Sequence, residues 1–252
     1  MSKKDLRQQE ILRIIDKKGL VEVRELVNTL NVTDMTIRRD IAECENQLLL
    51  INGIVIKKDT NEKMYHVNHQ RYLFEEEKRK IGHYAASLVN NDESIGIDLG
   101  TTTEYMASFL PESSDNLVVC NALNIFNELE KKNLREVILC GGRYHPHTQT
   151  FDSSRTLEAI RDYRFSKVFM SAAGFSLQMG ATCVNDYETS YKKLLMANAV
   201  EKILLIDSSK YQVTRTVSYA DAFDFTKIIT DAIFTKEDQK LLQNRGIEYV
   251  EV

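Results

Sequence analysis

The chain has 252 residues, of which 43% are hydrophobic and 28% are charged, a balance typical of a water-soluble globular protein. It contains no apolar run of about 18 residues and no apolar segment near its start, so we expect neither a membrane span nor a signal peptide. The net charge is −4, but residues 1–58 carry +2 and the remainder carries −6, which indicates a small basic module and a larger acidic one. The four cysteines are far apart and lie in apolar runs, which predicts buried thiols in a cytoplasmic protein.

The first module begins with apolar side chains at helical spacing over residues 4–17, which predict a helix. Residues 20–23 read as a short extended stretch and residues 24–30 as a second helix. A tight connection then leads to Thr33, a suitable N-cap for a third helix over residues 33–46. A helix, a short turn and a further helix predict a helix-turn-helix.

The third helix has two different faces. Its apolar stripe comprises Ile37, Ile41, Cys44 and Leu48. The opposite arc carries Met35, Thr36, Arg38, Arg39 and Ala42. Two adjacent arginines in the first turns suit a helix that enters the DNA major groove, with Thr36 or Met35 against bases. A plain solvated surface is the alternative interpretation of the same pattern.

A β-hairpin is predicted to follow the third helix. Asn52-Gly53 separates two apolar runs, residues 48–51 and 54–58, and Asn-Gly in such a position strongly favours a hairpin turn. Three helices and a hairpin form a winged helix. Lys57 and Lys58 end the wing, where they could bind backbone phosphates.

Residues 59–74 are polar and read as a linker, and residues 75–89 as a helix that opens a second domain over residues 75–252. Strands then alternate with helical segments, which predicts a parallel, doubly wound α/β sheet. The predicted strands are 94–98, 117–120, 136–140, 166–170, 202–206, 226–230 and 247–250. Ligands of such sheets bind beyond the carboxyl ends of the strands.

Small and polar residues collect at these strand ends. Asp98, Gly100 and Thr101–Thr103 follow the first strand, where backbone N–H groups and hydroxyls could bind a phosphate, or where the threonines could simply begin a helix. Glu188 and Lys192 stand at helical i, i+4 spacing, and a surface ion pair explains them equally well. His145 and His147 flank a proline without further ligands at standard spacing, so we expect no metal site and no cofactor.

The sequence resembles the DeoR family of bacterial transcription regulators along nearly its whole length. The resemblance rests on Thr33-Asp-Met-Thr-Ile-Arg-Arg-Asp-Ile41, Asp98-Leu-Gly-Thr-Thr102, Val118-Val-Cys-Asn-Ala-Leu123, Gly141-Gly142 and Asp207-Ser-Ser-Lys210. It implies a winged helix followed by an effector domain similar in fold to ribose-phosphate isomerases, which senses a phosphorylated sugar. The effector-binding residues that it implies are Asp98, Gly100, Thr101, Thr102, Thr103, Asn121, Gly142, Asp207 and Lys210, with Lys80 on the preceding helix as a further candidate. Asp186 and Glu188, which lie on a segment rich in polar groups, complete the predicted effector site.

These observations predict a repressor of a carbohydrate operon, a homodimer or homotetramer that binds operator DNA and is released by a sugar phosphate. An activator would have the same sequence features. The rival hypothesis is an isomerase-like enzyme with an accessory DNA-binding domain, in which Asp98, Asp186 or Glu188 acts as the base and Lys210 binds phosphate.

Overall fold

The computed structural model of the chain describes residues 3–44, 47–51, 53–57 and 66–252. It divides into two compact units, Met1–Leu73 and Phe74–Val252. Asn52 of the predicted hairpin turn and Lys58 of the predicted wing lie outside the described residues.

The first unit is a winged helix, as the sequence predicts. Its antiparallel sheet has the order β1-β3-β2. The elements are α1 (Lys3–Lys18), β1 (Leu20–Glu22), α2 (Val23–Leu30), α3 (Asp34–Glu43), β2 (Leu48–Ile51) and β3 (Ile54–Lys57). One buried core joins them, and Ile11, Leu26, Ile37 and Val55 lie at its centre. Because α3 ends at Glu43, the helical position predicted for Leu48 is wrong, and Leu48 reaches this core from β2.

A short helix, α4 (Val67–Tyr72), lies within the stretch that the sequence predicts to be a linker. The residues between β3 and His66 are outside the described part of the chain.

The second unit is built on a parallel sheet of seven strands in the order β15-β14-β12-β9-β4-β5-β6. The strands are β4 (Ser94–Ile97), β5 (Ser113–Cys120), β6 (Asn133–Leu139), β9 (Phe165–Ser171), β12 (Ala199–Leu205), β14 (Lys227–Thr230) and β15 (Glu248–Glu251). All seven strands predicted from the sequence are therefore present. The chain builds outwards from β4 through β5 to β6 and then returns to β9 on the other side of β4. The topological switch point thus lies between β4 and β9.

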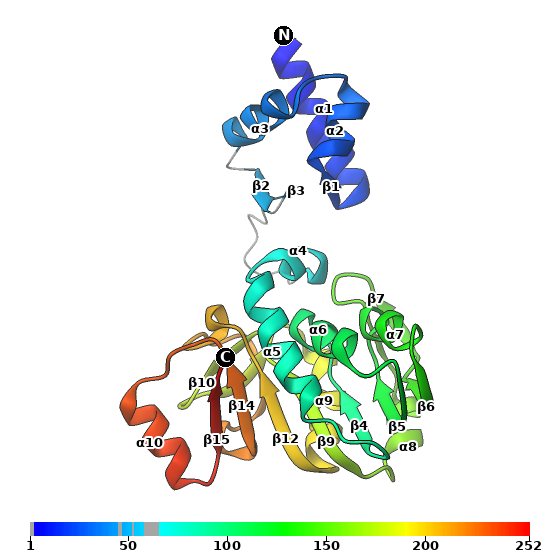
Figure 1. Cartoon of the computed structure of the whole chain (residues 1–252), viewed down its shortest axis with the longest axis vertical. Helices are drawn as coiled ribbons and strands as arrows, with labels where there is room; N and C mark the ends of the chain where they lie inside the picture. The colour runs from blue at the N-terminus through cyan, green and yellow to red at the C-terminus, as the bar shows by residue number, and fades with distance from the viewer. Residues whose placement is uncertain (1–2, 45–46, 52, 58–65) are drawn as a thin grey trace. The chain divides into compact units, whose positions relative to one another are not determined.

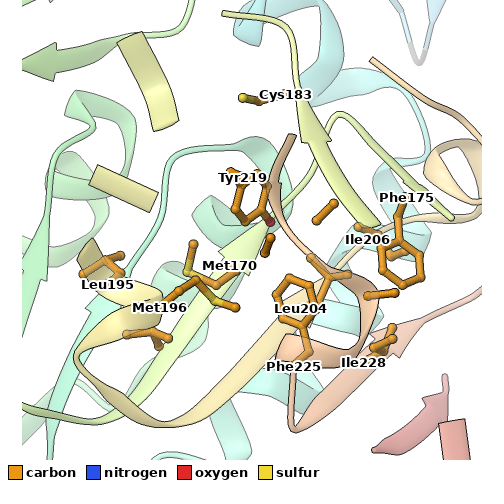
Figure 2. Close-up of a cluster of buried hydrophobic side chains, with 14 of the residues drawn as sticks. Met170, Phe175, Cys183, Leu195, Met196, Leu204, Ile206, Tyr219, Phe225 and Ile228 are labelled. Carbon is orange, nitrogen blue, oxygen red and sulfur yellow. The ribbon is translucent and has the colours of Figure 1, made fainter. Parts of the chain in front are cut away.

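Helices cover both faces of this sheet (Figure 1). One face packs against α5 (Glu75–Ser87), α6 (Thr101–Phe109) and α7 (Leu123–Leu129). The other packs against α8 (Ser154–Ile160), α9 (Thr189–Ala197) and α10 (Lys236–Asn244). Successive residues alternate between the two cores, so that Phe169 faces α5 and α6 while Met170 faces the larger core shown in Figure 2.

Two small antiparallel elements are absent from the sequence prediction. One is the hairpin of β7 (Arg143–His145) and β8 (Thr150–Asp152), and the other is a sheet of β10 (Gly174–Ser176), β11 (Gly180–Cys183) and β13 (Val217–Ala220). Every residue of β10 and β11 is buried, so these short strands lack the alternation of apolar and polar residues that marks a half-exposed strand.

Candidate functional sites

The outward arc of α3 is exposed at its N-terminal half. The side chain of Thr33 accepts a hydrogen bond from Thr36 N–H at 3.3 Å and so caps the helix. Met35 is 80% exposed, and Arg39 is also exposed. Arg38 pairs with Asp34 at 2.5 Å one turn earlier, and both side chains are about half exposed. Exposed pairs of this kind contribute only about 0.2–1 kcal/mol, so Arg38 can exchange its partner for a phosphate at small cost.

The aspartate that follows the two arginines has a structural role that the sequence pattern does not reveal. Asp40 is 1% exposed and accepts hydrogen bonds from Arg7 Nε at 2.5 Å and Arg7 Nη2 at 3.0 Å. This two-point contact ties α1 to α3, which fixes the side of α3 that faces outwards. The spacing of 33 residues between the partners gives no local signal.

In the wing, Lys57 pairs with Asp16 of α1 at 2.6 Å, and both side chains remain more than half exposed. Lys57 is therefore held beside α1 but stays open to solvent. Lys58, the second lysine predicted to contact DNA, is not among the described residues.

In the second unit, a buried ion pair lies at the switch point between β4 and β9. Asp98 is fully buried after β4, and its Oδ2 pairs with the ammonium of Lys192 from α9, which is 1% exposed. The same oxygen accepts the backbone N–H of Ser171, at the end of β9, at 2.9 Å. Lys192 also donates to the Ser171 carbonyl at 3.1 Å and lies 4.8 Å from the centre of the Tyr219 ring. Asp98 therefore connects two strands and a helix.

Lys192 is not the surface residue that its i, i+4 spacing from Glu188 suggests, because both side chains are buried. Glu188 accepts Asn185 Nδ2 at 2.7 Å, within a capping box at the start of α9. Burial raises the pKa of Glu188 despite the nearby charge of Lys192. Burial alone would lower the pKa of Lys192, but the carboxylates of Asp98 and Glu188 outweigh it and raise that pKa above 10.5.

The loop after β4 turns tightly into α6. Gly100 has φ +134°, and a Cβ atom there would lie 3.0 Å from Ser171 Oγ, so the loop requires glycine. The three threonines that follow, Thr101–Thr103, are at most 6% exposed. Thr103 donates to the Gly100 carbonyl at 3.2 Å, which fits the prediction of threonines that begin a helix. The amide of Asn124 donates to the same carbonyl at 3.1 Å.

A cavity of about 230 Å³ opens beyond the carboxyl ends of β5 and β6. Its polar lining comes from five segments of the chain and includes Asn121, Asp152, Thr156, Tyr187 and Ser190. Asn121 is 3% exposed, and its Nδ2 donates to the Phe151 carbonyl at 3.2 Å. Its Oδ1 is buried without a hydrogen-bond partner among the described residues. A cavity of roughly 150 Å³ holds benzene, so this one has room for a substituted six-membered ring.

A second polar cluster lies beyond β12. Asp207 is 1% exposed, and its Oδ1 accepts Ser209 N–H at 3.1 Å. Its Oδ2 lies 4.0 Å from Nζ of Lys78, a residue of α5 that is also 1% exposed. Burial, together with the charge of Lys210, lowers the pKa of Lys78 to about 8, although the charge of Asp207 opposes the shift. Burial also lowers the pKa of Lys210.

The structure does not bring every predicted effector residue into these clusters. Lys80 is exposed on α5. The lysine of this helix that lies near Asp207 is Lys78. The sequence does not distinguish the two lysines, because both belong to one charged run. Asp186 is exposed at the start of η1 (Asp186–Glu188). Packing explains the glycine at position 142, because a Cβ atom there would lie 2.0 Å from the Asp152 carbonyl oxygen.

The histidine and cysteine side chains considered as possible ligands have structural contacts instead. His145 stacks on Tyr187 with 3.7 Å between ring centres, and its Nε2 lies 3.4 Å from Asp152 Oδ2. Within the described ranges, no group of three or more His, Cys, Asp and Glu side chains could bind a metal ion. All four cysteines are free, and burial raises the pKa of Cys120, Cys140 and Cys183 to about 12. None of the helices that the structure describes has the length and apolarity to cross a bilayer.

A winged helix with an exposed arginine-bearing helix, joined to an α/β unit with polar clusters at its strand ends, defines a DNA-binding regulator with a sensor domain. Comparison with protein families supports both parts. Residues 7–57 match the DeoR-like helix-turn-helix domain, and residues 74–232 match the DeoR C terminal sensor domain. The chain belongs to the DeoR family of transcription regulators.

The similarity to known repressors extends over nearly the full length of the chain. It is 27% identical to the deoxyribose operon repressor of Escherichia coli K12 over 247 residues, which cover 98% of each protein. It is 32% identical to the lactose phosphotransferase system repressor of Staphylococcus epidermidis, over 96% of this chain and 97% of that one. Ribose 5-phosphate isomerase A from Methanocaldococcus jannaschii shares 16% identity over 55% of each chain with a TM-score of 0.41, a likeness of fold that carries no argument about activity.

Proposed function

We propose that the protein is a repressor of a carbohydrate operon that acts in the cytoplasm and leaves its operator when a sugar phosphate binds. The observation that carries this proposal is the row of polar groups along one sheet edge, from the buried Asn121, Asp98 and Asp207 to the partly buried Lys210. Charged and hydrogen-bonding groups gathered at one sheet edge can bind the hydroxyl and anionic groups of a small polyhydroxylated anion. The names of the two repressors that the chain resembles support the sign of the regulation.

On the DNA side, we infer that α3 enters the major groove. Arg38 and Arg39 would contact phosphates and guanine edges, and Met35 and Thr36 would face bases. Lys57 would bind backbone phosphate. Since a single winged helix reads a short site, a homodimer or homotetramer would supply the remaining affinity.

On the effector side, the cavity beside Asn121 would hold the hydroxyl-bearing part of the sugar, because the unpartnered Asn121 Oδ1 needs a donor. Oδ2 of Asp98 is engaged by Lys192 and Ser171, whereas its Oδ1 is buried without a hydrogen-bond partner among the described residues, and the Glu188 carboxylate is engaged by Asn185. These engagements weigh against an isomerase base, so we infer a site that binds without conversion.

A mobility-shift titration with DNA from upstream of the gene tests this proposal. We expect a panel of sugar phosphates to include one that weakens operator binding by about five- to 150-fold, the usual range of coupling between sites. Unchanged binding across the panel would refute effector release. Conversion of ribose 5-phosphate by the protein, lost in Asp98→Asn or Glu188→Gln, would support the enzyme instead.

A further inference from the structure

The two adjacent arginines of α3 have different electrostatic surroundings. Nε of Arg38 donates to Oδ1 of Asp34 at 2.5 Å, and these side chains are 49% and 53% exposed. The two terminal nitrogens of Arg38 and Oδ2 of Asp34 have no hydrogen-bond partner among the described residues. The pair therefore has no net charge, yet it presents donors and an acceptor to solvent.

Arg39 has no such neutralising partner. It is exposed and forms no hydrogen bond or ion pair with the residues that the structure describes. The acidic residue one turn further along, Glu43, is engaged by α1 instead, since it pairs with Lys4 and accepts Gln8 Nε2 at 3.1 Å. Arg39 thus keeps its full charge, whereas the charge of Arg38 is balanced within the helix.

This difference favours different contacts with DNA. A phosphate contact depends on net charge, and a base contact depends on the arrangement of the N–H groups. If Arg38 turned to a phosphate, the released Asp34 carboxylate would lie beside the negative backbone and oppose the contact. If the pair stays together, Nη1 and Nη2 of Arg38 remain for O6 and N7 of guanine, the acceptors that arginine contacts in a bidentate manner.

The pair is also formed before DNA arrives. Asp34 follows the N-cap Thr33, whose hydroxyl lies 2.8 Å from the hydroxyl of Thr36 within the same turn. Since Asp34 already restrains Arg38, less side-chain freedom is lost when the guanidinium meets a base.

We propose that Asp34 is a specificity-determining residue of the DNA-binding unit. It positions Arg38 to read a guanine of the operator, and its Oδ2 accepts from the amino group of an adjacent cytosine. Arg39 is left to bind a backbone phosphate. This inference rests on the proposed entry of α3 into the major groove and deepens it, because it assigns different contacts to the two arginines.

The first experiment is selection of binding sites from a random-sequence duplex library by the full chain, without any sugar phosphate. We expect the wild type to select a site with at least one fixed guanine. Arg38→Met should lower the discrimination at that guanine by about 5- to 150-fold, the value of one bidentate contact. Asp34→Asn should change the preferred base beside it from cytosine to adenine, because asparagine binds N6 and N7 of adenine.

A modified base tests the guanine contact directly. Replacement of the fixed guanine by 7-deazaguanine removes the N7 acceptor. It should weaken binding of the wild type and of Arg39→Met by about 10- to 150-fold, the range for one hydrogen bond to a charged group. Arg38→Met should bind both duplexes equally.

Salt dependence tests the phosphate contact. Arg39→Met should lower the slope of log affinity against log salt concentration by about 0.9, the value for one phosphate. The double variant Asp34→Asn, Arg38→Met preserves the net charge and should leave the slope unchanged. The matched control is Glu25→Gln, which removes a paired acidic residue from the first turn of α2 and should keep the base preferences of the wild type.

The possible results separate this inference from the placement of α3. The inference is overturned if no guanine is fixed, if Asp34→Asn keeps the wild-type preference, or if the double variant loses as much salt dependence as Arg39→Met. If Arg38→Met and Arg39→Met both weaken binding equally on every sequence, α3 still meets DNA and only the division of contacts is wrong. If neither variant weakens binding, the placement of α3 fails as well.

Discussion

Replacement of Lys192 by methionine tests whether the buried ion pair stabilises the switch point of the sheet. Methionine preserves much of the length of the side chain but removes its charge. The Asp98 carboxylate would remain fully buried, with Ser171 N–H at 2.9 Å as its main remaining donor, because the Ser171 hydroxyl at 3.1 Å also donates to the Leu99 carbonyl. Removal of one partner of a buried pair costs about 3–5 kcal/mol, a large share of the roughly 5–15 kcal/mol that stabilises a domain.

The double variant Lys192→Met, Asp98→Asn separates the stranded charge from lost packing. The asparagine can still accept from Ser171 N–H but carries no charge, so the double variant should be about 1–3 kcal/mol more stable than Lys192→Met alone. Urea unfolding followed by circular dichroism gives the free energies, and hydrogen exchange in β4 and β9 assigns the loss to the second unit. If Lys192→Met stayed within about 1 kcal/mol of wild type, or the double variant gave no recovery, the reasoning would be refuted.

Three further predictions concern both units. Arg39→Ala should weaken operator binding by about 1–3 kcal/mol in a mobility-shift assay. The control Arg13→Ala removes an exposed arginine of α1 and should leave operator binding unchanged. Equal losses of affinity in the two variants would argue against α3 as the recognition helix. Asp40→Ala should destabilise the winged helix by about 1–3 kcal/mol in thermal unfolding, because Arg7 loses its two-point partner; an unchanged midpoint would contradict this. Glu188→Gln should gain stability relative to wild type as pH rises. The folded-state pKa of Glu188 is raised, so its contribution to stability is fully present below about pH 4.5 and is lost as pH rises through the folded value; a pH-independent difference in urea unfolding would exclude this.

The sequence predicts the architecture well where periodic patterns act locally. All seven strands of the parallel sheet follow from apolar runs of ordinary length separated by helical segments. The helix α3 follows from its N-cap and its two faces. The strands β10, β11 and β13 do not, because they are three or four residues long and because every residue of β10 and β11 is buried.

The polar clusters are harder to predict because their members are distant in sequence. Spacing on a helix associates Lys192 with Glu188, yet its ion-pair partner is Asp98, 94 residues away. Asp207 could be placed at a strand end from its motif, but the choice between Lys78 and Lys80 depends on which face of α5 packs on the sheet. The inward position of Asp40 likewise depends on Arg7, which belongs to another helix.

The sequence separation of Asp98 and Lys192 has a consequence for synthesis of the protein. At about 5–20 residues per second, a ribosome needs roughly 5 to 20 seconds to make the 94 residues between them. Until β9 is made, 73 residues after Asp98 at its last residue Ser171, β4 has no neighbour in the sheet other than β5. The nascent Asp98 carboxylate must stay hydrated until α9 emerges, so we expect the second unit to fold late and as a whole. The winged helix, whose core lies within residues 11–55, is complete long before that. A newly made chain would therefore display a folded DNA-binding unit before it has a sensor to control it.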